Sequence, residues 1–419
     1  MAGESPGNKW AYTVLSDISS DIAYGYTQSA SEEKVGPHFL RITDIQDGIV
    51  DWHSVPYCPI STSDHAKYKL ECGDIVVART GNSTGENFIF RANEDAVFAS
   101  YLIRFRIDSN EADPLFVWYC MRTPAWWSFI NNSKTGSAQA GANAKVLGQF
   151  ELPLPSPNEQ RAIAEILGSL DDKIELNRRM NRALEGMARA IFKAWFIDFE
   201  PVKAKAAGAT SFRGMPQPVF DQLPDRFVDS PIGPVPEGWE AERVDSACTF
   251  NYGKALKASD RSGGVVPVYG SNGVVGWHDK ALTDGPGVVV GRKGNPGTVV
   301  WVQTEFYPID TTFFVTPARV DCPLSYLRFA LEYLRLDAYG SDSAVPGLSR
   351  KMAYGLPIVV PDVKTTSSFD ELFQSFQEMV HANEHESRVL AGIRDALLPK
   401  LISGELRVDA AARGTQEVA

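Results

Sequence analysis

Several features are scarce or missing in the sequence, and each absence narrows its possible functions. No apolar run approaches the roughly 18 residues that a membrane span needs, and the first residues do not follow a signal-peptide pattern. The five cysteines are odd in number, scattered, and never spaced as a metal knuckle. We therefore expect reduced thiols in a cytoplasmic protein rather than a disulfide or zinc scaffold.

Motifs that would carry catalysis are also missing. The glycine-rich stretch 291–297 lacks the Lys-Ser/Thr ending of a Walker A loop, and no Asp/Asn-Pro-Pro-aromatic motif of an amine methyltransferase is present. The Glu-x-Lys spacing at 32–34 has no suitably spaced acidic partner, and His381 and His385 have no evident third metal ligand. No nucleophile elbow is found. We expect no catalytic residue, metal site or cofactor on this chain.

Positive charge is scarce as well. The chain has 41 Lys and Arg against 52 Asp and Glu, a net charge of -11. This balance argues against a protein coated in phosphate contacts, so that a nucleic-acid role would need local basic patches or a more basic partner. With 419 residues, the chain should form two or three domains.

What the sequence does contain is a long heptad seam between residues 158 and 198. Steps of four and three residues along this stretch give the following positions: Ile163, Leu167, Leu170, Ile174, Asn177, Asn181, Leu184, Ala188, Ile191 and Trp195. No proline interrupts the run, which predicts one helix of roughly 40 residues that needs a partner of similar length.

A second seam supplies that partner. The same steps give these positions: Phe369, Phe373, Phe376, Val380, Asn383, Ser387, Leu390, Arg394, Leu397 and Leu401. With an offset of 206, Asn383 falls on Asn177. A polar residue in an apolar seam fixes register, which favours a pair of helices. The alternative is two unrelated amphipathic helices, each packed on its own domain.

The regions around these helices repeat. Residues 11–107 hold short strand-like runs, and 114–130 is helical in character with a break at Pro124. From Trp239 the pattern begins again. The matching stretches are Trp10 with Trp239, 24–25 with 252–253, 76–82 with 289–295, 136–137 with 340–341, and 152–153 with 356–357. The difference in residue number between the members of a pair falls only from 229 to 204 along the chain. Their collinearity predicts an internal duplication.

In both copies a strand ends in a basic, glycine-bearing loop, at 79–83 and 292–295. Arg and Asn suit bidentate contacts to guanine and adenine edges. The alternative is ordinary turn chemistry, since Gly, Asn and Ser dominate turns anyway. The candidate DNA-binding residues are Arg79, Thr80, Asn82, Lys134, Gln139, Asn143 and Lys145 in the first copy, and Lys254, Tyr269, Ser271, Asn272, Arg292, Lys293, Asn295, Arg350 and Lys351 in the second.

At these residues the sequence resembles the specificity subunits of type I restriction-modification systems. The resemblance covers nearly the whole chain, and its most specific stretches are 157–163, 176–181, 196–201, 236–239, 267–273 and 397–405. The second helix departs from the family pattern, because 365–369 (TTSSF) replaces the expected Glu-Gln-type start.

The resemblance implies an α+β fold with two similar target-recognition domains, each reading one half of a split DNA site, separated by two long helices that form an antiparallel coiled coil. The expected segments are 1–155 and 236–361 for the two domains, 156–200 and 362–408 for the helices, 201–235 for a surface connector, and 409–419 for a disordered tail.

The resemblance also implies partners. The subunit would bind double-stranded DNA, two methylation subunits that carry S-adenosylmethionine and modify adenine, and restriction subunits that use ATP and magnesium. It would have no catalysis of its own. Two alternatives are an adaptor whose duplicated domains bind other proteins, which the negative charge favours, and a fused methyltransferase-nuclease remnant, which the missing motifs disfavour.

Overall fold

The computed structural model describes residues 10–46, 48–134, 142–340 and 347–408. The chain groups into two compact units, and each unit contains part of both long helices. Unit 1 consists of residues 1–175 and 386–419, and unit 2 of residues 176–385. The predicted disordered tail, 409–419, lies outside the described residues.

The two long helices are confirmed. Helix α5 (Pro157–Phe192) runs for 36 residues and continues as the π-helical turn Lys193–Ile197. Helix α11 (Val363–Ser403) runs for 41 residues. Its unusual start is capped by Asp362, whose Oδ1 accepts hydrogen bonds from the backbone N–H groups of Lys364 (3.1 Å) and Thr365 (3.0 Å). No helix in the described ranges combines the length and apolarity needed to cross a bilayer.

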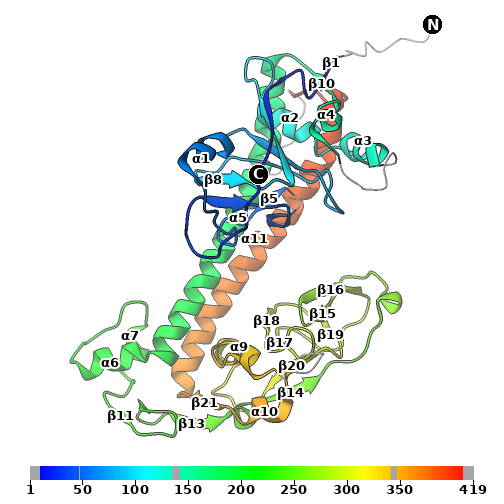
Figure 1. The fold of residues 1–419 in the computed structure, drawn as a ribbon. Helices are drawn as coiled ribbons and strands as arrows, with labels where there is room; N and C mark the ends of the chain where they lie inside the picture. Colours follow the sequence, from blue (N-terminus) through cyan, green and yellow to red (C-terminus); the bar gives the residue numbers. More distant parts are fainter. Residues whose placement is uncertain (1–9, 47, 135–141, 341–346, 409–419) are drawn as a thin grey trace. The chain divides into compact units, whose positions relative to one another are not determined.

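Within each unit, α5 and α11 lie side by side (Figure 1). In unit 2, Asn177 Nδ2 donates to the carbonyl of Asn383 (3.3 Å), and Asn383 Nδ2 donates to Asn181 Oδ1 (2.8 Å). In unit 1, Arg394 Nη1 donates to Asp171 Oδ1 (2.7 Å). In these contacts, a higher residue number on α5 goes with a lower one on α11, so the two helices are antiparallel. The asparagines of the two seams meet, which rules out two unrelated helices.

The sheets of the two units repeat the same topology, which confirms the predicted duplication. Each main sheet has four antiparallel strands. In spatial order they are β2 (Ser19–Tyr24), β9 (Leu102–Ile107), β6 (Ile75–Ala78) and β7 (Asn87–Ile89) in unit 1, and β14 (Cys248–Tyr252), β20 (Thr312–Pro317), β17 (Gly287–Gly291) and β18 (Val299–Val302) in unit 2.

Smaller strand pairs repeat as well. An antiparallel pair carries the chain into each long helix: β1 (Ala11–Val14) with β10 (Glu151–Leu154), and β13 (Glu240–Arg243) with β21 (Pro357–Val360). A parallel pair lies beside each main sheet: β3 (His38–Leu40) with β8 (Ala96–Phe98), and β15 (Val266–Gly270) with β19 (Tyr307–Pro308). Three antiparallel pairs do not repeat. They are β4 (Ile45–Gln46) with β5 (Ile49–Val50), β11 (Phe227–Val228) with β12 (Val235–Pro236), and β15 with β16 (Gly273–His278).

Shorter helices attach each sheet to the long pair. The predicted break at Pro124 is confirmed, because α2 (Pro114–Cys120) ends before it and α3 (Pro124–Lys134) begins there. The hydroxyl of Tyr119 on α2 donates to Asp171 of α5 (2.7 Å). In unit 2, the buried Arg328 on α9 (Leu324–Tyr333) pairs with Glu185 of α5. The other short helices are α1 (Thr62–Tyr68), α4 (Ala144–Leu147), α8 (Val244–Ala247), α10 (Arg350–Tyr354) and the 3-10 turns Ile42–Asp44, Ala258–Asp260 and Leu336–Tyr339.

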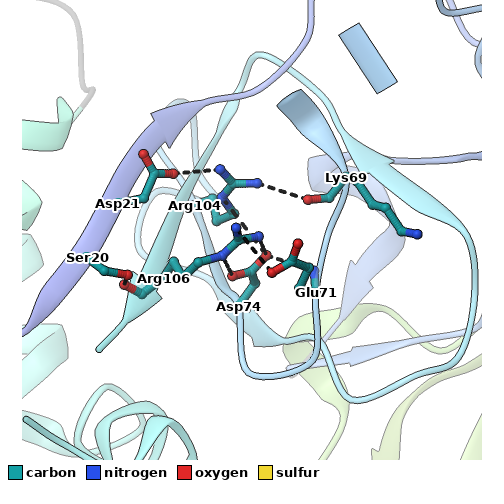
Figure 2. A network of polar contacts seen from close by, with 7 residues as sticks. All are labelled: Ser20, Asp21, Lys69, Glu71, Asp74, Arg104 and Arg106. Atoms are coloured by element: carbon teal, nitrogen blue, oxygen red, sulfur yellow. Dashed lines mark hydrogen bonds and ion pairs between the residues drawn. The ribbon is translucent and has the colours of Figure 1, made fainter. Parts of the chain in front are cut away.

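A buried ion network joins strands β2 and β9 of unit 1 to the loop that leads into β6 (Figure 2). Asp74, 1% exposed, accepts two hydrogen bonds of 2.8 Å from the guanidinium of Arg106. Arg104 is also buried and donates to Asp21 (2.6 Å) and to the carbonyl of Lys69 (2.9 Å). Buried charges need such partners, so the network fixes where β2, β6 and β9 meet.

The connector is more than a surface loop. It contains α6 (Glu200–Ala206) and α7 (Gln217–Phe220), and Val202 and Phe220 are buried in the core of unit 2. Lys205 Nζ donates to three carbonyls, those of Phe220 (3.1 Å), Asp221 (2.8 Å) and Leu223 (2.6 Å). The isolated apolar residues of this segment therefore anchor it, and one ammonium group closes its turn.

All five cysteines are free thiols, as predicted, and only Cys72 is exposed. Burial raises the pKa of Cys248 and of Cys322 to about 12 and raises that of Cys58. Because the thiolate is the reactive form, we expect iodoacetamide at pH 8 to label Cys72 alone in the native protein and all five thiols after unfolding. Mass spectrometry checks this, with a Cys72→Ser variant as control. Rapid native labelling of Cys248 would contradict it.

Candidate nucleic-acid interface

The loop after β6 in unit 1 holds Arg79 in a fixed pose. Its backbone N–H donates to the carbonyl of Tyr101 (3.0 Å), and its side-chain Nε donates to the carbonyl of Ser100 (2.9 Å). The guanidinium lies over the rings of Tyr24 (5.3 Å to the centroid) and Tyr101 (5.9 Å). Cation–π contact and a backbone acceptor together orient the cation.

The loop after β17 in unit 2 holds Arg292 in the same way. Its backbone N–H donates to the carbonyl of Thr311 (2.9 Å), and Nη1 donates to the carbonyl of Asp310 (3.0 Å). Its guanidinium lies over the rings of Tyr252 (4.9 Å) and Phe313 (5.8 Å). The two loops that were paired by sequence therefore hold their arginine side chains in similar positions.

A glycine follows the tyrosine in both units, because another chain segment crosses there. A Cβ on Gly25 would lie 2.2 Å from the carbonyl oxygen of Ala99, and one on Gly253 would lie 2.1 Å from that of Ile309. The next residue in each crossing segment, Ser100 or Asp310, supplies the carbonyl group that accepts the hydrogen bond from the arginine side chain. A side chain at either glycine would push the crossing strand away and disturb the arginine's acceptor.

Neither arginine is neutralised within the part of the chain that the structure describes. Arg79 and Arg292 have backbone acceptors but no carboxylate within ion-pair distance there, whereas Arg41, Arg104 and Arg106 all pair with aspartates. Because one guanidinium presents five N–H donors, each arginine retains donors for a ligand. Two oriented, unneutralised guanidinium groups suit an anionic or hydrogen-bonding ligand such as DNA.

Comparison with known proteins gives a consistent result. Residues 15–186 match the family model for the type I restriction modification DNA specificity domain. The type I restriction enzyme MjaIX specificity subunit of Methanocaldococcus jannaschii is 25% identical over 374 residues, covering 80% of this chain and 76% of that protein. The HindI specificity subunit of Haemophilus influenzae is 23% identical, covering 95% of this chain and 99% of the relative. The chain therefore carries a type I restriction modification DNA specificity domain over residues 15–186, and it resembles type I restriction enzyme specificity subunits over most of its length.

A solved structure shows the same fold. The crystal structure of the S subunit of the type I restriction-modification system from M. genitalium matches with a TM-score of 0.57 at 17% identity, covering 96% of this chain and 98% of that one. The α+β fold with an internal repeat and a long antiparallel helix pair is thus a known architecture.

The other predicted residues of unit 1 take different places. Thr80 is half-buried, Asn82 is exposed, and Lys145 is exposed on α4. Asn143 caps α4, because its Oδ1 accepts from the N–H of Val146 (2.9 Å). Lys134 ends α3, and its side chain and the whole of Gln139 lie outside the described residues.

In unit 2, some predicted residues face solvent and others are used internally. The exposed ones are Lys254, Asn272, Lys293, Asn295 and Lys351. Tyr269 is half-buried and packs its ring against that of Phe306 (6.0 Å). Ser271 is 8% exposed and donates its hydroxyl to the carbonyls of Lys293 and Thr311 (3.3 Å). Tyr269 and Ser271 therefore hold the loop in shape.

Arg350 joins the arrangement in unit 2. Its guanidinium lies over the ring of Tyr252 (4.8 Å), the ring that Arg292 also contacts. Sequence reasoning did not include Tyr24 and Tyr252 among the candidates, although both stand in a repeated Tyr-Gly pair. The repeated Tyr-Gly pair was the sequence signal that could have identified them. The structure shows that both tyrosines are exposed, 44% for Tyr24 and 47% for Tyr252.

Proposed function

We propose that this specificity subunit reads a bipartite DNA site, with unit 1 contacting one half-site and unit 2 the other. The observation that carries the proposal is the repeated pose of Arg79 and Arg292, each held on aromatic rings by backbone carbonyls and each without a carboxylate partner among the described residues. An arginine so placed suits the O6 and N7 atoms of guanine in the major groove.

We also propose that the helix pair docks two methylation subunits and sets the spacing of the half-sites, and that restriction subunits join the same complex in the cytoplasm. S-adenosylmethionine, ATP and magnesium would be held by those partners, and this chain would carry no catalysis. An apolar stripe outside the seam supports docking, since Leu176, Met180 and Met187 on α5 are 48%, 41% and 51% exposed. The net charge of -11 fits a chain whose partners supply most phosphate contacts.

The test uses the complex assembled with its methylation subunits. Sequencing of methylated adenines in host DNA defines the motif. We expect Arg292→Ala to reduce discrimination at one position of one half-site by about 1–3 kcal/mol, and Arg79→Ala to do the same in the other half-site. The control is Arg243→Ala, because Arg243 is exposed and already paired with Asp245 (3.0 Å).

Two results would contradict the proposal in different ways. Equal weakening of all sequences by Arg292→Ala would mean that this residue contacts only phosphate. A complex that binds neither random nor motif-bearing duplex DNA in the presence of methylation subunits would favour the alternative of a protein-binding adaptor.

A further inference from the structure

A cavity of about 610 Å³ lies beside Arg79 in unit 1. Three segments line it: 26–30 after β2, 39–43 at the end of β3, and 99–101 before β9. The last of these contains Ser100, whose carbonyl holds the Arg79 guanidinium. The cavity and the arginine therefore share a wall.

Backbone hydrogen bonds identify the corresponding place in unit 2. The N–H of Ala99 donates to the carbonyl of Leu40 (2.9 Å), and the N–H of Ile309 donates to that of Tyr269 (2.9 Å). Each bond joins the segment that holds the arginine to the end of the parallel strand, which is β3 in unit 1 and β15 in unit 2. The segment after β15 thus corresponds to the cavity wall formed by residues 41–43.

The two chains diverge at this point. In unit 1 the chain turns into the short helix Ile42–Asp44, and Arg41 at the cavity wall is held by two hydrogen bonds to Asp44 (3.0 and 2.8 Å). In unit 2 it forms a hairpin, and Val275 of β16 packs 3.0 Å from where a Cβ on Gly270 would lie. Unit 2 therefore has a hairpin at the chain position where unit 1 has the cavity wall of residues 41–43.

The hairpin turn is bonded to the loop of Arg292. Ser271 donates its hydroxyl to the carbonyl of Lys293, and the hydroxyl of Thr298 donates to the carbonyl of Ser271 (2.9 Å). These bonds carry Asn272 and Val274 beside the loop, and Val274 is 47% exposed although apolar. An exposed amide and an exposed isopropyl group are the chemistries that contact adenine edges and thymine methyl groups.

We propose that these divergent elements discriminate between the two half-sites: the cavity wall of Gln28 and Thr43 in unit 1, and the hairpin turn of Asn272 and Val274 in unit 2. Elements held in corresponding ways in both units make the same kind of contact, so Arg79 and Arg292 read a base common to both half-sites. Differences between the half-sites are read where the chains differ. This inference rests on the proposed function.

The experiment measures methylation by the assembled complex on DNA in which each motif position is randomised in turn. Asn272→Ala is expected to reduce discrimination by about 5- to 150-fold at one position of one half-site and to leave the other half-site unchanged. Gln28→Ala is expected to act on the other half-site. The half-site that a variant does not affect serves as its folding control within the same complex.

A second variant separates a base contact from a folding effect. Uracil in place of thymine removes only a methyl group, and we expect it to weaken methylation by the native complex about fourfold at the position that Val274 contacts. In Val274→Ala the two bases should be equivalent. If all these variants leave both half-site profiles unchanged while a bipartite motif is still methylated, this inference is wrong and the proposed function stands. Without a bipartite motif, both are wrong.

Discussion

Asp74→Ala should lower the free energy of unfolding of unit 1 by about 3–5 kcal/mol, the range for breaking a buried ion pair. The carboxylate is 1% exposed and receives hydrogen bonds of 2.8 Å from Arg106 and from the N–H of Glu71. Arg104 Nε lies 4.0 Å from it. Alanine would remove the buried anion that faces both arginines, leaving, among the described residues, Arg104 only its pair with Asp21 (2.6 Å) and Arg106 only its pair with Glu71 (3.2 Å).

Hydrogen exchange of the β6 and β9 amides, followed in increasing urea, measures this loss within unit 1. The matched control is Asp172→Ala, which removes an ion pair with Arg91 of 2.9 Å whose side chains are 60% and 41% exposed. For such a surface pair we expect less than about 1 kcal/mol. Equal losses in the two variants would show that burial does not set the strength of the network.

Phe369→Ala should lower the free energy of unfolding of unit 2 by about 3–5 kcal/mol, since a large buried ring is removed. Phe369 is 1% exposed and belongs to the seam of α11. Its ring centroid lies 5.5–6.3 Å from five others, those of Phe192, Trp195, Phe196, Phe329 and Phe373. Rings from α5, α9 and α11 cannot all move to fill the gap.

The control for this variant is Met379→Ala on the same helix, because Met379 is 43% exposed. A surface substitution of this kind should change stability by no more than about 0.5 kcal/mol. Amide exchange in α9 reports on unit 2, and exchange in β6 reports on unit 1. Similar losses for Phe369→Ala and Met379→Ala would contradict the assignment of this ring cluster as the core of unit 2.

The helices were predictable because their signal is periodic. Heptad spacing identified both seams, and the shared asparagine identified their register, which Asn177 and Asn383 confirm by direct contact. The ion network was not predictable, since Asp74, Arg104 and Asp21 are far apart in sequence and meet only when three strands pair.

The candidate site was predictable only in outline. Repetition identified the loops of Arg79 and Arg292, but turn composition does not say which polar side chains face inward. Ser271 turns to a carbonyl 22 residues away along the chain, a contact that no local pattern encodes. Likewise, the apolar residues of the connector are anchors because a core was available to receive them.

Main-chain carbonyl groups of Ser100 and Asp310 hold the two arginines, and a residue of any type can supply such an acceptor. Glycine is required only at Gly25 and Gly253, where another chain segment crosses closely. The pose of Arg79 or Arg292 therefore tolerates substitutions in the surrounding loops, as long as the aromatic rings and the two glycines are kept. Under the proposed function, exchanging the hairpin or the cavity wall while the arginine stays in place would change the target preference of one half-site at a time.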